Sequence, residues 1–494
     1  MFFTSTRKNC NISASAAIAQ GIAADGGLFV PSEFPKLQPG ELEELAALPY
    51  KTRAAKILQK FLCDYSADEL NWCVEGAYEG RFDNNEPAPL AEIAPGVNIL
   101  ELWHGPTCAF KDMALQILPY LLTVATRKNC PERTTVILVA TSGDTGKAAL
   151  EGFADVPGTR IIVFFPVDGV SDMQKLQMVT QKGGNVSVCA IEGNFDDAQS
   201  GVKNIFADPE VAAYLEARNM EFSSANSINF GRLAPQIVYY ISSYCDLLKN
   251  GKISAGEAVN VAVPTGNFGN ILAAYYAKQM GLPVKRFICA SNRNNILSDF
   301  IATGVYDRNR DFYTTESPSM DILISSNLER LLYHLADGDC EKVAAWMRDL
   351  KEQGRYSVDS DILNKLQTEF YGGFCDDSAA RKTIKNCFEK FNYLCDTHTA
   401  VAVSVYEEYV KASGDTTPVI IASTASPYKF APAVLAALGG EVADSDGFAV
   451  MEALAAKSKT AIPVPLNALR ESTVLHNNTI ARENMAEFIK KVLA

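Results

Sequence analysis

The segment TTVILVATSGDTGKAALEGF, residues 134–153, carries the pattern that decides the fold class. It begins with β-branched and aliphatic residues, which predict a strand buried on both faces, and continues through a glycine-rich turn into residues typical of a helix. Strands that alternate with helices predict a parallel sheet covered by helices on both faces. The same type of apolar run recurs further along the chain, at 160–166, 185–191, 258–264, 285–291 and 418–424.

These runs fall into two groups, on either side of the polar, helical segment 195–250. We therefore expect an α/β fold with two doubly wound parallel sheets rather than one. In such sheets ligands bind outside the carboxyl ends of the strands, so the loops after the runs are the first place to search for a site. The N-terminal residues predict helices after a short β-like opening, and we expect a domain boundary in the proline-containing stretch 81–93.

The composition is that of a water-soluble globular protein of two to four domains. The 494 residues are 48% hydrophobic and 21% charged, and no apolar run approaches the length of a membrane helix. The 45 lysines and arginines against 58 aspartates and glutamates give a formal charge of −13. This charge argues against nucleic acid or an anionic membrane as the main partner. An anionic ligand must therefore be bound locally, by oriented backbone N–H groups and a few cations.

The cysteines and histidines indicate a reduced, metal-free protein. The 12 cysteines form no C-x-x-C pair, and the first residues lack the features of a signal peptide. We therefore expect buried thiols and a cytoplasmic location. The four histidines are never spaced for a metal-binding helix, so we expect no metal site.

Two glycine-rich loops are candidate anion sites. Residues 141–146 (TSGDTG) and 264–270 (PTGNFGN) each follow a predicted strand and precede a predicted helix. Small residues allow backbone N–H groups to converge, and the helix adds the positive end of its dipole. The alternative is an ordinary strand–helix connection, in which glycine and asparagine are common. A Walker A motif is excluded because Thr141 and Ala148 stand where it needs a glycine and a hydroxyl residue.

Lys111 is the candidate reactive residue. It lies in HGPTCAFKD, residues 104–112, just before an apolar segment with helical spacing, and Phe110 and Met113 flank it. Desolvation and a positive helix end both disfavour the ammonium, which lowers the lysine pKa and frees the amine as a nucleophile or base. The alternative is a surface ion pair with a neighbouring carboxylate such as Asp112.

The motifs HGPTCAFKD, ATSGDTG, SANSINFGRLAPQ, VPTGNFGN, SPSMDI, SSNLER and STASPYKF occur in this order. Together they resemble the threonine synthase family, pyridoxal-phosphate enzymes of the tryptophan-synthase-β fold type (fold type II). The resemblance extends from about residue 25 to about residue 435 and is to the longer branch, which has its own N-terminal domain. We therefore expect an N-terminal domain at 1–88, a large cofactor domain at 89–130 and 226–440, a small substrate domain at 131–225, and a C-terminal helical segment at 441–494.

The resemblance implies a cofactor site. Lys111 matches the lysine that holds pyridoxal 5'-phosphate as a Schiff base. Thr424 matches the hydroxyl residue that meets the pyridine nitrogen, and a neutral partner there suits elimination and replacement chemistry. The loop matched to the cofactor phosphate comprises Gly266, Asn267, Phe268, Gly269 and Asn270.

The resemblance also implies a substrate site. Its polar residues could instead cap the backbone of their loops, and its cations could instead form structural ion pairs. The matched polar residues are Thr141, Ser142, Asp144, Thr145, Ser224, Asn226 and Asn229, and the candidate cations for the substrate phosphate are Arg232 and Lys429.

The chain departs from the family pattern at three positions, Cys108, Thr397 and Ser426. Cys108 replaces an aliphatic residue and changes little. Ser426 stands where the family usually has histidine, which could alter the pocket beside the cofactor ring. His398 is retained, and we expect it to be structural rather than catalytic.

The implied reaction converts O-phospho-L-homoserine and water to L-threonine and phosphate by γ-elimination and β-addition, with Lys111 carrying the protons. This reaction is the last step of threonine biosynthesis. Two alternatives stay open: a phospho-lyase that uses the same parts to release a keto acid, and a noncatalytic protein that keeps only the fold. We expect a small-molecule substrate and a monomer or homodimer, with no nucleic-acid or membrane partner.

Overall fold

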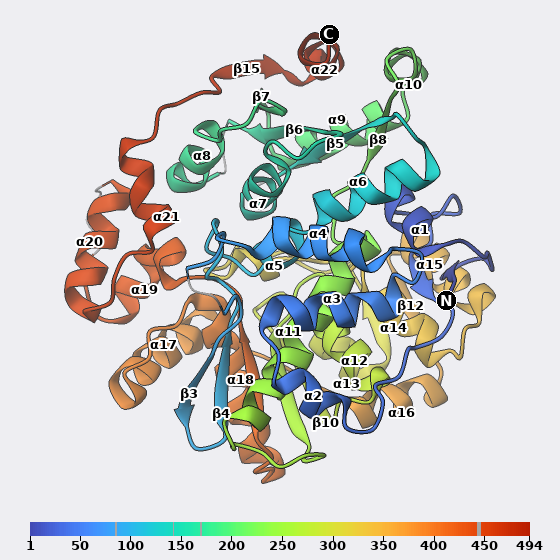
Figure 1. The fold of residues 1–494 in the computed structure, drawn as a ribbon. Helices are drawn as coiled ribbons and strands as arrows, with labels where there is room; N and C mark the ends of the chain where they lie inside the picture. The colour runs from blue at the N-terminus through green and yellow to red at the C-terminus, as the bar shows by residue number, and fades with distance from the viewer. Residues whose placement is uncertain (84–85, 142, 168–169, 442–445) are drawn as a thin grey trace.

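The computed structural model describes residues 1–83, 86–141, 143–167, 170–441 and 446–494. Two sheets organise the molecule, one above the other in Figure 1. The larger has the order β13-β10-β9-β14-β4-β3, with parallel pairing except between β3 and β4. Its strands are β3 (Leu90–Ala94), β4 (Val97–Glu101), β9 (Val259–Pro264), β10 (Val284–Ser291), β13 (Phe370–Phe374) and β14 (Val419–Ser423).

The smaller sheet is entirely parallel, with the order β15-β7-β6-β5-β8. Each of the six apolar runs forms a strand within a residue or two of its expected bounds, so the prediction of an α/β fold with two parallel sheets is confirmed. The strands of the smaller sheet are β5 (Thr134–Ala140), β6 (Thr159–Pro166), β7 (Val186–Glu192), β8 (Met220–Ser223) and β15 (Asn478–Ala481).

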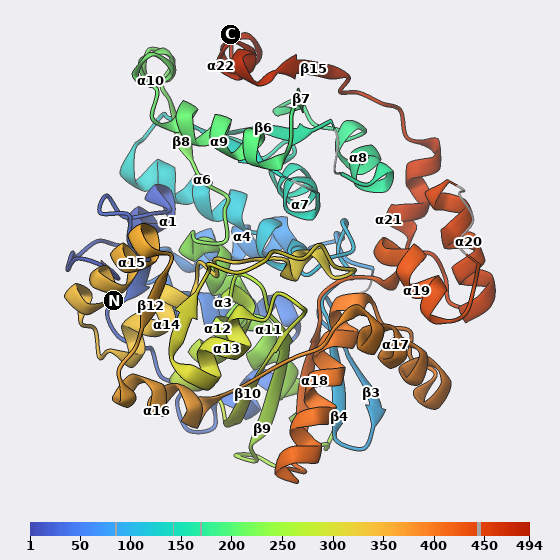
Figure 2. The ribbon, with the colours of Figure 1, turned by 180° about the vertical axis from the view of Figure 1, so that it is seen from behind.

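Helices cover both sheets, as the alternating pattern requires (Figure 2). Around the smaller sheet lie α6 (Leu118–Asn129), α7 (Asp144–Phe153), α8 (Asp172–Val179), α9 (Phe195–Phe206) and α10 (Pro209–Glu216). The hairpin of β11 (Val305–Asp307) and β12 (Arg355–Ser357) is grouped with the larger sheet. The helices grouped with this sheet are α5 (Asp112–Leu115), α11 (Phe230–Lys249), α12 (Gly269–Met280), α13 (Ile296–Thr303), α14 (Leu328–Leu335), α15 (Cys340–Gln353), α16 (Ser360–Glu369), α17 (Asp377–Phe391) and α18 (Thr397–Ser413).

The N-terminal residues pack against the larger sheet's helices instead of standing apart. They form β1 (Phe3–Ser5), α1 (Ala14–Gln20), β2 (Phe29–Pro31), α2 (Glu41–Ala46), α3 (Tyr50–Phe61) and α4 (Ala67–Tyr78). Helices α2 and α3 lie against α11 (Figure 1). The buried Arg53 of α3 donates a 2.6 Å hydrogen bond to Asp246 of α11.

The C-terminal segment is not purely helical, contrary to expectation. After α19 (Ala431–Ala437), α20 (Gly447–Ser458) and α21 (Val464–Asn467), the chain runs along the outside of the molecule to the smaller sheet (Figures 1 and 2). There β15 pairs with the edge strand β7, and α22 (Met485–Val492) follows. The sequence NTIA of β15 is short and partly exposed, so its apolar pattern is too weak to predict a strand. No helix in the described ranges is long and apolar enough to span a membrane.

Candidate active site

The predicted site residues come from loops at the carboxyl ends of β5, β8, β9 and β14, from the start of α11 and from the segment before α5. Backbone contacts join two of these parts directly. Phe110 N donates a 2.8 Å hydrogen bond to the carbonyl oxygen of Thr424, and Ala109 forms a bridge with Ala425. Lys111 therefore lies directly before α5, in the segment that pairs with the loop after β14, and Thr424 of that loop is buried.

Lys111 is a largely buried amine in a mixed electrostatic environment. Its side chain is 12% exposed, and its Nζ lies 3.8 Å from Asp144 Oδ2 and 3.4 Å from Ser319 Oγ. Burial lowers the pKa of Lys111, and the positive charges of Lys429 and Arg232 lower it further, against the opposing effect of Asp144. The amine is therefore easier to deprotonate than an exposed lysine.

Asp112 does not form the surface ion pair that local sequence allows. Its carboxylate is fully buried and accepts hydrogen bonds from the backbone N–H and the hydroxyl of Thr107, at 2.8 and 2.7 Å. Burial raises the pKa of Asp112 to about 6. The surface-pair alternative for Lys111 is therefore wrong, because Asp112 points into the protein and shapes the turn that carries the lysine.

The loop between β9 and α12 has the features of an anion cradle. Phe268 has a φ of 63° and directly precedes α12, whose first N–H groups have no acceptor within the helix. A Cβ at Gly266 would lie 2.7 Å from the carbonyl oxygen of Ser319, so only glycine fits there without displacement. Asn270 is buried, and its Oδ1 accepts a hydrogen bond from Tyr239. Its Nδ2 has no partner among the described residues, which leaves a buried donor for a ligand.

The loop after β5 brings Asp144 between two lysines. Asp144 Oδ1 lies 2.7 Å from Lys429 Nζ and accepts a 3.1 Å hydrogen bond from Gln174. Burial works against ionisation, but Lys429 and Lys111 hold the pKa of Asp144 below its ordinary value. Thr141 Oγ1 accepts from the N–H groups of Gly143 and Gly146, so this residue caps its own loop.

Two further predicted residues belong to this loop. Thr145 is only partly buried, and Ser142 lies outside the described residues.

The segment 224–232 contributes a buried cation. Arg232 is 4% exposed, its guanidinium donates a 2.7 Å hydrogen bond to the carbonyl oxygen of Ala225, and burial lowers its pKa to about 10. In the described part of the chain its Nε has no hydrogen-bond partner and no carboxylate pairs with it. A buried cation without a counter-ion is costly unless it serves an anionic ligand.

The polar residues before Arg232 are used by the protein itself. The fully buried Asn229 donates to the carbonyl oxygens of Ile18 and Ser224 and accepts from Gly231 N–H, so it anchors α11 to α1. Ser224 Oγ accepts from Asn226 N–H, and Asn226 is exposed. These contacts match the capping alternative, and a substrate role for these three residues stays a prediction.

The departures from the family pattern also have structural roles. Ser426 is fully buried, donates its N–H to Cys108 O and accepts from Tyr428 N–H, so it caps the short turn that carries Lys429. Thr397 donates a 2.7 Å hydrogen bond to Glu316 O.

Ser319 and Gln174 were not among the predicted site residues. Ser319 lies in the motif SPSMDI, which was the available signal, but contact between that motif and Lys111 depends on the tertiary fold. Gln174 lies in no motif.

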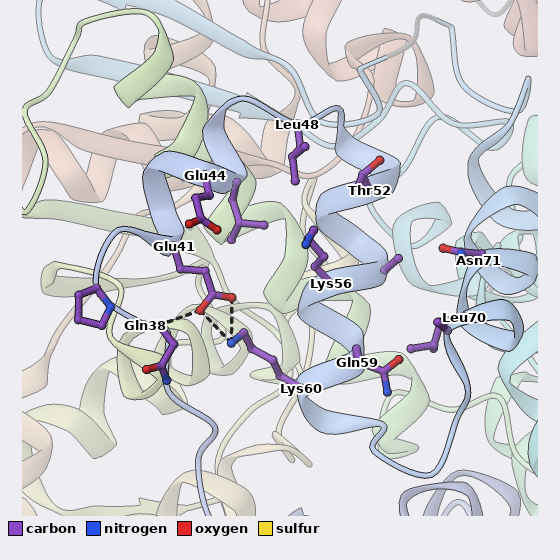
Figure 3. Close-up of a pocket in the computed structure, with 14 residues that line it drawn as sticks. Gln38, Glu41, Glu44, Leu48, Thr52, Lys56, Gln59, Lys60, Leu70 and Asn71 are labelled. Atoms are coloured by element: carbon purple, nitrogen blue, oxygen red, sulfur yellow. Dashed lines mark hydrogen bonds and ion pairs between the residues drawn. The ribbon is translucent and has the colours of Figure 1, made fainter.

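A separate cavity of about 590 Å³ lies between α2, α3 and α4 (Figure 3). The ion pair of Glu41 and Lys60 lies at its rim. None of the predicted site residues lines it, so it forms no part of the site around Lys111.

Three family models match the chain in succession. "Threonine synthase N terminus" matches residues 2–78, "Pyridoxal-phosphate dependent enzyme" matches 89–424, and "Threonine synthase, C-terminal" matches 399–473.

Curated relatives and solved structures agree with these models. Human threonine synthase-like 1 is 43% identical over 86% of this chain, which covers 58% of that protein's length; the other threonine synthase-like 1 proteins are similarly longer. The threonine synthase of Schizosaccharomyces pombe is 38% identical, over 88% of this chain and 89% of that protein. The pyridoxal-phosphate-bound threonine synthase of Brucella melitensis superposes with a TM-score of 0.89 at 35% identity, over 100% of this chain and 99% of its own. The chain therefore belongs to the threonine synthase family of pyridoxal-phosphate-dependent enzymes.

Proposed function

We propose that this protein is a threonine synthase, which converts O-phospho-L-homoserine and water to L-threonine and phosphate with pyridoxal 5'-phosphate. The observation that carries the proposal is Lys111 itself: a largely buried amine, 3.8 Å from Asp144 and joined through Ser319 to the cradle at 266–270. Lys111 and Lys429 lie against Asp144, and Arg232 and Asp112 also act on Lys111. Three cations therefore face two carboxylates, which leaves a local excess of positive charge in an acidic protein. Such an excess suits a phosphate-bearing ligand.

The residues present fit the cofactor. Gly266 leaves room where a Cβ would meet Ser319, the start of α12 offers free N–H groups, and Asn270 Nδ2 is a buried donor with no partner among the residues that the structure describes. Residues 266–270 would hold the cofactor phosphate, Thr424 its ring nitrogen and Lys111 its aldehyde carbon. When bound, pyridoxal phosphate supplies an electron sink that stabilises negative charge on the substrate's α-carbon.

The protein's own part is to bind phosphohomoserine and move protons. Arg232 and Lys429 would bind the substrate phosphate, which would compete with Asp144 for Lys429. The lowered pKa of Lys111 favours a free amine, which can take a proton from one substrate carbon and return it to another. Burial of Asp144, Arg232 and the Lys429 side chain keeps these charge interactions strong, because little water screens them.

A second candidate is a phospho-lyase that converts the same substrate and water to 2-oxobutyrate, ammonia and phosphate. The chain is 42–43% identical to threonine synthase-like 1 proteins and 37–38% identical to the fungal and bacterial threonine synthases, so membership of the family does not by itself fix the product. Both candidates use Lys111 and the cradle, so only the products separate them. The cytoplasmic location, the oligomeric state and the domain boundaries stay predictions.

The test is incubation of the purified protein with pyridoxal phosphate and phosphohomoserine, with threonine, 2-oxobutyrate and phosphate all measured. Equal amounts of threonine and phosphate support the proposal, and 2-oxobutyrate as the chief product supports the second candidate. The holoprotein should show a visible absorption band that borohydride bleaches. Lys111→Ala should lack both the band and the activity, whereas the exposed Lys385→Ala should keep both. A wild-type protein that stays colourless with added cofactor contradicts both candidates.

A further inference from the structure

Ser319 lies between Lys111 and the cradle. It belongs to a short 3-10 turn, Pro318–Met320, whose Met320 is buried while Ser319 is exposed. Its Oγ is 3.4 Å from Lys111 Nζ, and its carbonyl oxygen is the atom that a Cβ at Gly266 would meet. Ser319 therefore contacts the Lys111 amine through its hydroxyl, and its carbonyl oxygen leaves no room for a side chain at position 266 of the cradle.

The backbone of Ser319 is held from behind by His398. Ser319 N–H donates a 3.1 Å hydrogen bond to His398 Nε2, and the other ring nitrogen, Nδ1, lies 2.7 Å from Asp396 Oδ2. Ser319 N–H can only donate and an ionised carboxylate can only accept, so the ring carries its proton on Nδ1. His398 is 1% exposed and Asp396 fully buried, so water does not compete for these contacts.

Asp396 is itself fixed by the start of α18. It caps that helix, because its carboxylate accepts from the backbone N–H groups of His398 and Thr399 at 3.0 Å. A carboxylate is favoured at a helix N-terminus, where the dipole is positive. A continuous series of contacts therefore runs from α18 through Asp396, His398 and Ser319 to the Lys111 amine.

We propose that Ser319 is the hydrogen-bond acceptor that orients the Lys111 amine during its proton transfers, and that His398, held by Asp396, is the residue that positions Ser319. The proposal rests on the proposed function. The other groups that bear on the amine are Asp144, Lys429, Arg232, Asp112 and the ring of Phe110. Among them Asp144 is the other acceptor near Nζ, so Ser319 supplies a second one that carries no charge.

The test uses variants that remove or keep one of two hydrogen-bond acceptors: Ser319 Oγ, which faces the Lys111 amine, and His398 Nε2, which faces Ser319 N–H. Ser319→Ala removes the hydroxyl, and His398→Leu removes the acceptor for Ser319 N–H. His398→Gln places an amide oxygen close to the position of Nε2 and should retain that hydrogen bond. Ser413→Ala, whose hydroxyl bonds Tyr409 O, and His334→Gln, whose ring bonds Tyr276, are matched controls outside the series.

Two measurements distinguish a loss of orientation of the Lys111 amine from a general disturbance of the structure. In the cofactor-free protein, the pH midpoint of Lys111 reductive methylation, followed by peptide mass spectrometry, should fall by about one pH unit in Ser319→Ala and His398→Leu, because an acceptor stabilises the protonated amine. In the holoprotein, kcat should fall about tenfold in the same two variants while KM changes little. His398→Gln and both controls should stay near wild type in both measurements.

Unchanged midpoint and kcat in Ser319→Ala overturn the role of Ser319. An unchanged midpoint in folded His398→Leu, or an equal shift in His334→Gln, overturns the role of His398. If His398→Leu does not fold, the exposed Ser319→Ala and the conservative His398→Gln still decide. A wild-type protein that makes neither threonine nor 2-oxobutyrate contradicts the proposed function, but the methylation midpoints still test the contacts to Lys111.

Discussion

Single residues near Lys111 have roles that their neighbours in sequence do not indicate. Asp112 is adjacent in the chain but turns into the protein, whereas Asp144 is 33 positions away and provides the nearest carboxylate. Burial therefore acts on the two carboxyl groups differently. It raises the pKa of Asp112, whose partners come from Thr107, while two lysines keep Asp144 ionised.

Asp112 should make stability depend on pH in a specific way. Its folded pKa, about 6, lies above the unfolded value of 3.8, so the folded state holds this proton more tightly and the group's stabilising contribution is lost as the pH rises through that window. We expect the difference in free energy of unfolding between wild type and Asp112→Asn to fall by about 2 kcal/mol from pH 4 to pH 6. Urea unfolding of both proteins across this pH range measures the difference. A difference that stays constant from pH 4 to pH 6 would contradict the raised pKa of Asp112.

Lys429 should affect substrate binding more than cofactor binding. In Lys429→Met, one of two candidate cations for the substrate phosphate is lost, and we expect KM for phosphohomoserine to rise about tenfold or more. Cofactor affinity should change little, because the cradle at 266–270 is intact. Steady-state kinetics and a cofactor titration measure the two effects. A loss of cofactor affinity with an unchanged KM would mean that Lys429 serves the cofactor and not the substrate phosphate.

At the scale of elements, both glycine-rich loops follow parallel strands and begin helices, as expected from their composition. Their details differ, however. The loop after β5 uses Thr141 to cap itself and presents Asp144. The loop after β9 has a glycine against Ser319 and a buried Asn270 donor that no described residue pairs with. These differences depend on packing partners far along the chain, so the local pattern alone cannot distinguish an anion cradle from a capped turn.

Gly266→Ala should weaken cofactor binding without unfolding the protein. The added methyl would lie 2.7 Å from Ser319 O, so the loop or the turn at 318–320 must move. We expect the dissociation constant for pyridoxal phosphate to rise about tenfold or more, since a shift of the cradle misplaces its N–H groups. Gly184→Ala is the control, because the nearest described atom to a Cβ there is Asp155 Oδ1 at 3.6 Å, an ordinary van der Waals contact. Equal affinities for pyridoxal phosphate in the two variants would show that the close approach of residue 266 to Ser319 O does not affect cofactor binding.

At the scale of the whole molecule, the N-terminal and C-terminal segments are parts of one structure. Helices α2 and α3 pack on α11, whose first turn carries Arg232, and β15 extends the smaller sheet from the far end of the chain. The N-terminal segment is thereby connected to the site through α11 and through the contact of Asn229 with α1.

The ion pair of Arg53 and Asp246 should couple the N-terminal helices to the core. Arg53 is 1% exposed, so Arg53→Ala leaves Asp246 without its partner, and we expect a loss of about 3 kcal/mol in the free energy of unfolding. Denaturant unfolding followed by circular dichroism and by tryptophan fluorescence should give one shifted transition. An early separate transition, with an unshifted main one, would mean that the N-terminal helices unfold independently.

The sequence by itself determined the two sheets of parallel strands and the six strands of the apolar runs, and it singled out Lys111 as the candidate reactive residue. Periodicity and composition are local properties, and the chain shows them without a partner. Only the tertiary structure decided that Asp144 rather than Asp112 faces the amine, that β15 joins β7, and that Ser319 and His398 stand behind Lys111. These contacts join residues up to 290 or so positions apart, and no local pattern encodes which distant side chain will fill a given space.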